Sequence, residues 1–160
     1  MTEQTLQKVD HNALRTNQII IILLNITAFI FVQPWLAAFV ALVMLTGVLR
    51  RKPGFDFVYK LFLLPTNVIK PDILNDHAEP HQFAQLLGGV FTGLGAVLLL
   101  GQVIIPGWIL IWFVVALAAL NAFGGFCVGC AIYYWLGRFK ISGFSKTPPE
   151  GTIPGRKPER

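Results

Sequence analysis

The two residues best suited to chemistry are Cys127 and Cys130, the only cysteines in a chain of 160 residues. Their Cys-x-x-Cys spacing allows a pair of thiols to cycle between dithiol and disulfide, to pass on sulfane sulfur, or to supply two ligands to a metal ion. We favour redox or sulfur-transfer chemistry at this pair. Metal binding is one alternative, and burial as small inert apolar side chains is another.

A metal site would require ligands besides the two thiols, because structural zinc takes four. The three histidines, His11, His77 and His81, are expected on the same side of the membrane as the cysteines. Taken individually, each of them is expected to be a solvated loop residue rather than a ligand. No nucleophile–base triad, phosphate-binding loop or paired catalytic carboxylates is visible in the sequence, and no bound cofactor is predicted.

The composition identifies the environment in which this pair must work. The chain is 54% hydrophobic and only 13% charged, whereas soluble domains have about 25% charged residues. No Asp, Glu, Lys or Arg occurs between positions 16 and 49 or between positions 80 and 137. Apolar runs of about 20 residues have the length of the hydrocarbon layer of a bilayer, and both of these runs are at least that long. We therefore predict an integral membrane protein whose main partner is lipid, and no nucleic-acid-binding motif is present.

Each uncharged run is too long for one transmembrane helix and contains a turn signal. Pro34 lies in the middle of the first run, and Pro106-Gly107 divides the second. The predicted fold is all-α, with four transmembrane helices arranged as two hairpins in a single domain over residues 1–142. The predicted spans are residues 15–32, 35–51, 83–105 and 108–137.

The segments outside the spans have distinct characters. Phe55, Val58, Leu61 and Phe62 recur at helical spacing, which predicts a short interfacial helix between the hairpins. An irregular loop is expected over 70–80. Residues 143–160 are rich in Pro, Gly and Lys, which predicts a disordered tail.

The two hairpins share a faint pattern. Asp10-His11 precedes the first and Asp76-His77 precedes the second, and each hairpin turns at a Pro followed within two residues by Trp. One interpretation is a duplicated hairpin. The other is that any two membrane hairpins share such features.

The basic residues predict the orientation. All 13 Lys and Arg fall in the N-terminal segment, the middle connection or the C-terminal segment, and the two hairpin turns have none. By the positive-inside rule, these three segments and both termini are expected in the cytoplasm.

On a continuous last helix, the two cysteines would lie at the inner membrane edge, near the helix C-terminus. The helix dipole there disfavours a thiolate, so a basic group is expected to compensate, with Arg15, Arg50, Arg51 and Arg138 as candidates. A stripe of small residues is expected to pack the third span on the fourth, with the cysteines facing away from it. The residues of this stripe are Gly89 and Gly93 on the third span, and Asn121, Gly125 and Gly129 on the fourth.

Several of these residues resemble a known family. Phe83-Ala84-Gln85, Asn121-Ala122 and, most specifically, Gly125-Phe126-Cys127-Val128-Gly129-Cys130 resemble the bacterial membrane family named domain of unknown function 4395, over most of residues 9–138. The family has no established activity. Its members are often associated with thioredoxin-like or rhodanese-like proteins, which implies a thiol or sulfur role with such a partner. The sequence departs from the family by having Gln82 where relatives often have Arg, and Asp10-His11 where many have Asp-Pro.

Together these features predict a dithiol protein of the bacterial inner membrane that works with a soluble cytoplasmic partner in redox or sulfur relay. Metal binding or transport through Cys127, Cys130 and the histidines is the alternative. A structural membrane subunit without chemistry is the third possibility.

Overall fold

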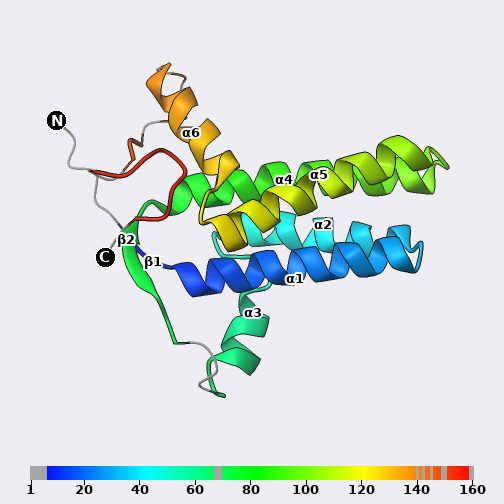
Figure 1. Cartoon of the computed structure of the whole chain (residues 1–160), viewed down its shortest axis with the longest axis horizontal. Coiled ribbons are helices and arrows are strands. Elements are labelled where there is room, and N and C mark those ends of the chain that lie inside the picture. The colour runs from blue at the N-terminus through cyan, green and yellow to red at the C-terminus, as the bar shows by residue number, and fades with distance from the viewer. Residues whose placement is uncertain are drawn as a thin grey trace.

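The structure is a computed structural model, and it describes residues 7–66, 70–139, 141, 143–144, 146–148 and 151–158. The chain is mostly helical. Figure 1 shows the long helices side by side, with the hairpin turns at one end of the bundle. The strands β1 (Gln7–Asp10) and β2 (Ile73–Asp76) and the helix α6 (Val128–Arg138) lie at the other end. The bundle helices are α1 (His11–Ile30), α2 (Pro34–Leu49), α4 (Ala78–Leu100) and α5 (Ile104–Gly124).

Three of these helices, α1, α4 and α5, are long and apolar enough to cross a membrane, and α2 is a shorter apolar helix. The chain is therefore a membrane protein by the length and composition of its helices. The first hairpin turns where predicted, because Pro34 occupies the first turn of α2. The second turns earlier than predicted. Gln102 has a left-handed backbone between α4 and α5, and Pro106 lies inside the first turn of α5, where its missing N–H costs no hydrogen bond.

The bundle core consists of small and branched apolar side chains. Ala28, Ala37 and Ala96 are buried near the turns, and Ile21 and Val40 are buried nearer the other end. Such small side chains allow the helix axes to approach closely, which favours association in a membrane.

Glycines of α4 help it to pack, but against a different helix from the one predicted. An added Cβ on Gly89 would lie 3.0 Å from the Leu45 side chain, and one on Gly93 would lie 3.6 Å from Ala41. Both neighbours belong to α2. The prediction was based on glycine pairs expected at the same membrane depth on the third and fourth spans. Equal depth does not specify which neighbouring helix each pair contacts, so the prediction named the wrong helix.

The segments that precede α1 and α4 each form a β-strand, although the sequence predicted no strand there. β1 (Gln7–Asp10) and β2 (Ile73–Asp76) pair antiparallel, with Gln7 opposite Asp76. β2 replaces much of the loop expected over 70–80. The side chain of Asp10 then caps α1 by accepting hydrogen bonds from the N–H groups of Asn12 at 3.0 Å and Ala13 at 3.4 Å.

The predicted short helix between the hairpins is present as α3 (Asp56–Val58) and the π-helical turn η1 (Tyr59–Leu63). Phe57, Leu61 and Phe62 are exposed, as a helix lying on a membrane surface requires. Tyr59 is buried and donates a hydrogen bond to Asp10 at 2.9 Å. Burial, then this contact with the carboxylate, raises the pKa of Tyr59 to about 12.

The predicted last span, 108–137, is not one helix. α5 ends at Gly124, Gly125 adopts a left-handed backbone with φ of 63°, and a separate helix α6 (Val128–Arg138) begins after Cys127. Glycine adopts this conformation without the steric cost that other residues incur. Figure 1 shows α6 diverging from the axis of α5.

The expected disordered tail is also wrong for its described part. Residues 151–158 return to the α5–α6 junction, where Phe126 forms an isolated β-bridge with Arg156. The N–H of Lys157 donates to the Gly125 carbonyl at 3.1 Å. The Pro- and Gly-rich composition is therefore compatible with an extended, ordered segment here. Backbone hydrogen bonds to residues far away in the sequence order this segment.

Candidate functional site

The break between α5 and α6 changes the position of both cysteines. Cys127 is the N-cap of α6, and Cys130 lies in the first turn of that helix. The Sγ atom of Cys127 accepts a hydrogen bond from the Cys130 N–H at 3.2 Å. The prediction that the pair lies near a helix C-terminus is therefore wrong. The N-terminal end of a helix favours negative charge and lowers the cost of forming a thiolate.

The two cysteines form a disulfide, with Cα atoms 5.2 Å apart. Cys127 is only 4% exposed and Cys130 only 2%. The pair is thus bonded in this state and covered on both sides by other parts of the chain.

A histidine of α4 contacts the disulfide. The Nδ1 atom of His81 lies 3.4 Å from Sγ of Cys130. The expectation that the cysteines face away from the third span is wrong, because α6 packs on the first turns of α4. Gly129 makes this approach possible, since an added Cβ there would lie 2.7 Å from the backbone of Ala84.

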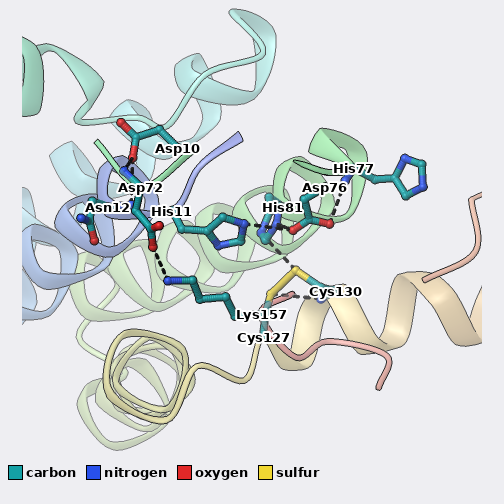
Figure 2. Close-up of polar contacts among 10 residues, drawn as sticks. All are labelled: Asp10, His11, Asn12, Asp72, Asp76, His77, His81, Cys127, Cys130 and Lys157. Atoms are coloured by element: carbon teal, nitrogen blue, oxygen red, sulfur yellow. Dashed lines mark hydrogen bonds and ion pairs between the residues drawn. A yellow bond between two sulfur atoms is a disulfide. The ribbon is translucent and has the colours of Figure 1, made fainter. Parts of the chain in front are cut away.

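Asp76 joins the histidines into one cluster, shown in Figure 2. Its Oδ2 atom lies 2.9 Å from Nε2 of His81 and 3.3 Å from Nε2 of His11, and its Oδ1 atom accepts the His77 N–H at 2.8 Å. Burial alone would raise the pKa of the Asp76 carboxyl, but these neighbours outweigh burial and hold it well below its usual range. Asp76 is therefore an anion that fixes the orientation of the His81 ring.

His77 does not join the cluster with its ring. Figure 2 shows the imidazole pointing away from the sulfur atoms, so only the backbone of His77 contributes. The side chain is 2% exposed, and its Nδ1 has no hydrogen-bond partner among the described residues. Burial, followed by nearby Lys146, lowers the pKa of His77.

The C-terminal segment covers the cluster. The Cys127 N–H donates to the Gly155 carbonyl at 2.7 Å, and Lys157 forms an ion pair with Asp72 of the segment before β2. A cavity of about 30 Å³ remains between this segment, the histidines and the disulfide, and Arg156 and Lys157 line it. Basic side chains near the pair thus come from the tail and from histidines, rather than from the four arginines expected at the membrane edge.

Two sets of side chains of the types that bind metal ions lie together in the described part of the chain. One comprises His81, Cys127 and Cys130, and the other comprises His11, Asp76 and His81; within each set, the ligand atoms lie within 4.8 Å of one another. The sequence analysis proposed all of these residues as site residues except Asp76. The repeated Asp-His pairs in the sequence are the signal that points to Asp76.

The fold and site define a helical membrane protein with a buried Cys-x-x-Cys disulfide beside a His–Asp pair. Residues 9–138 match the family described as Domain of unknown function (DUF4395), and the chain belongs to this family. No curated protein and no solved structure matches the chain.

Proposed function

We propose that this protein is a membrane thiol–disulfide oxidoreductase that exchanges electrons, or sulfane sulfur, with a soluble thioredoxin-like or rhodanese-like partner. The observation that supports it most directly is the contact between His81 and the Cys127–Cys130 disulfide, with Asp76 on the other side of the imidazole. A packing role for the cysteines requires no titratable neighbour. A redox role is assisted by one, because a general acid–base can protonate the leaving thiolate and later deprotonate the thiol.

The exchange proceeds in two steps. A thiolate of the reduced partner attacks Sγ of Cys127, the Cys127–Cys130 bond breaks, and Cys130 leaves as a thiolate that takes a proton through His81. The second thiol of the partner then attacks the mixed disulfide and releases Cys127 as a thiolate, which the N-terminus of α6 stabilises. The partner becomes a disulfide, and the pair becomes a dithiol.

The partner reaches Cys127 by the path that the tail now occupies. The tail pairs its backbone with Gly125 and Cys127 in an extended conformation, and an extended peptide of a partner can form the same hydrogen bonds. When the pair is reduced, the Cys127 thiolate would attack the outer sulfur of a partner persulfide by the same path. The partner's S–S bond would break, a persulfide would form on Cys127, and the partner would leave as a thiolate.

The orientation of the bundle is part of this proposal. We propose four membrane spans, α1, α2, α4 and α5, with the β1–β2 end, the cysteines and both termini on the cytoplasmic side of a bacterial inner membrane. In the sequence, the two hairpin turns have no Lys or Arg. Figure 1 shows these turns at the end of the bundle opposite β1, β2 and α6.

The experiment is a mixed-disulfide trap. The Cys130→Ser variant, purified in lipid nanodiscs, is mixed with an oxidised Cys-x-x-Cys protein of the thioredoxin class, and covalent adducts are detected on non-reducing gels. An adduct should form with Cys130→Ser and should be much weaker with the matched Cys127→Ser variant. If neither variant forms an adduct, and neither wild-type thiol is alkylated before denaturation, the pair serves only packing.

A second candidate function is zinc binding by the reduced pair, and one contact favours it. Metal-binding histidines typically donate their second ring nitrogen to a carboxylate, as His81 does toward Asp76. The reduced thiolates and Nδ1 of His81 would supply three ligands and leave a fourth position open. Elemental analysis of the protein purified under reducing conditions separates the two functions. Stoichiometric zinc that disappears in the His81→Asn variant would favour metal binding, and its absence would favour exchange alone.

A further inference from the structure

A second, apolar cavity also borders the disulfide. It has a volume of about 240 Å³ and is lined by residues of α1, α2, α4, α5 and α6. Phe91, Leu117, Val128 and Ile132 are among its apolar walls, and Cys127 forms part of its lining. Cys127 therefore separates a polar cavity that contains the histidines from an apolar cavity inside the bundle.

The apolar cavity reaches the outer surface of the helices. Two of its lining residues are half exposed, Phe113 on α5 at 49% and Ile132 on α6 at 42%. Because α5 is one of the helices able to cross a membrane, this surface faces the hydrocarbon layer. A ligand that enters here must be dissolved in the membrane.

Two amides are placed to bind polar atoms of that ligand. Gln18 and Asn121 both line the cavity, and their side chains form no hydrogen bond with any part of the chain that the structure describes. Asn121 also lines the small polar cavity around the disulfide. Ligand pockets commonly combine apolar walls with a few such polar groups.

We infer that this cavity binds the ring of a lipophilic quinone, which accepts the electrons of the reduced cysteine pair. This inference rests on the proposed exchange function and supplies its second substrate. A lipid acyl chain would need no amide donors, whereas the two oxygens of a quinone accept hydrogen bonds from Asn121 and Gln18. Quinones are also the membrane-soluble oxidants known to reoxidise dithiols.

The step balances without another reactant. The Cys127 and Cys130 thiols lose two electrons and two protons and form one S–S bond, and the quinone takes up both electrons and both protons as hydroquinone. A soluble dithiol then reduces the pair again from the polar side. Electrons thus pass from the partner, through the disulfide, to the membrane.

The test uses the full chain in nanodiscs, reduced, freed of reductant and kept without oxygen. Decylubiquinone is added, its reduction is followed by absorbance, and thiol loss is followed by gel-shift alkylation. Wild type should reduce one quinone per cysteine pair. Leu117→Trp, which fills the cavity, should slow this by about tenfold or more. Leu120→Trp is the matched control, because Leu120 is an exposed residue on the same helix and does not line the cavity.

Two further measurements separate the possible failures. Reduction of the disulfide by dithiothreitol should be equal in wild type, Leu117→Trp and Leu120→Trp, which shows that the pair is intact. Decylubiquinone should raise the unfolding temperature of oxidised wild type, with a smaller rise for Asn121→Leu.

The inference is overturned if quinone reduction by wild type is no faster than by Cys127→Ser, or if Leu117→Trp behaves like Leu120→Trp. In either case, normal exchange with the soluble dithiol would retain the proposed function and indicate that a lipid chain fills the cavity. Loss of exchange with the soluble dithiol would overturn both proposals.

Discussion

The imidazole of His81 and the sulfur of Cys130 lie 3.4 Å apart, although 49 positions separate them in the sequence. The first is on α4 and the second is in the first turn of α6, so only the packing of these two helices brings them together. Asp76 holds the other ring nitrogen of His81 at 2.9 Å. A thiol pair, a titratable ring and an orienting carboxylate thus meet at one point.

Replacing His81 tests whether this contact serves chemistry. His81→Asn should slow disulfide exchange with a soluble dithiol by about 100-fold, because a general acid–base contributes roughly 10²–10⁴-fold. His77 is a buried histidine beside the same carboxylate, but its ring points away from the sulfur atoms. The His77→Asn variant should therefore leave the exchange rate nearly unchanged. Equal rates in the two variants would contradict the role of His81.

The tail should control access to the cysteines, and two glycines provide a matched test. Gly155 has φ of 85°, and an added Cβ would lie 2.6 Å from the Cys127 carbonyl oxygen, whereas Gly151 has φ of 77° and open space around it. Gly155→Ala should displace the tail from Cys127. The rate of disulfide reduction should then rise by about tenfold, because the reductant no longer has to wait for the tail to open. Gly151→Ala should show the wild-type rate. No difference between the variants would mean that the tail is not the barrier.

The close packing of α6 against α4 depends on Gly129. A Cβ at this position would lie 2.6 Å from Cβ of Ala84, which is too close for a normal contact, whereas one at Gly93 would lie 3.6 Å from Ala41. Gly129→Ala should destabilise the fold by about 1–3 kcal/mol, as overpacking does, and should separate His81 from the disulfide. Gly93→Ala should be tolerated. Thermal unfolding in detergent would measure both, and a neutral Gly129→Ala would refute the close approach.

The charge of Asp76 predicts acid sensitivity. Its pKa is lower in the folded protein than in the unfolded chain, so its contribution to stability is present above the unfolded value of about 3.9 and is lost as the pH falls through the folded value. The unfolding temperature should therefore decrease below about pH 4. Asp76→Asn should be less stable at pH 7 by about 1–3 kcal/mol and should show a flatter acid profile. An unchanged profile would show that the carboxyl does not stabilise the fold.

The orientation can be measured with single cysteines in the Cys127→Ser, Cys130→Ser background. Lys70 precedes β2 and Gln102 lies in the second hairpin turn, at opposite ends of the bundle, and both are exposed. In intact cells, an impermeant maleimide should label Gln102→Cys directly and Lys70→Cys only after permeabilisation. The reverse result would invert the proposed topology.

The helices of the bundle follow from local features of the sequence. Charge-free runs of hydrophobic residues must satisfy their backbone groups internally within a membrane, which permits little besides helices. Pro34 marks the start of α2 because proline has no N–H to lose there. The Cys-x-x-Cys pair, the short helix after Gly54 and the family membership were likewise predictable from residues alone.

The structure of the site depends on contacts between distant residues. Nothing in the apolar run 108–137 except the Gly124-Gly125 pair signals that the helix stops, and an isolated glycine pair is compatible with an unbroken transmembrane helix. The left-handed turn at Gly125 converts the expected helix C-terminus into a helix N-terminus at Cys127. It thereby reverses the sign of the local dipole that acts on the thiols.

The surroundings of the thiols also depend on contacts between residues that are distant in the sequence. Strands of four residues, such as β1 and β2, are too short for their periodicity to be recognised in the sequence. Their register is set only by the pairing of one strand with the other. The tail pairs with Phe126 and Cys127 through backbone atoms, which every sequence possesses. The sequence by itself therefore determined the helical bundle, its membrane environment and the residues capable of chemistry. Only the tertiary structure decided which histidine contacts the sulfur, because that contact depends on how α6 packs against α4.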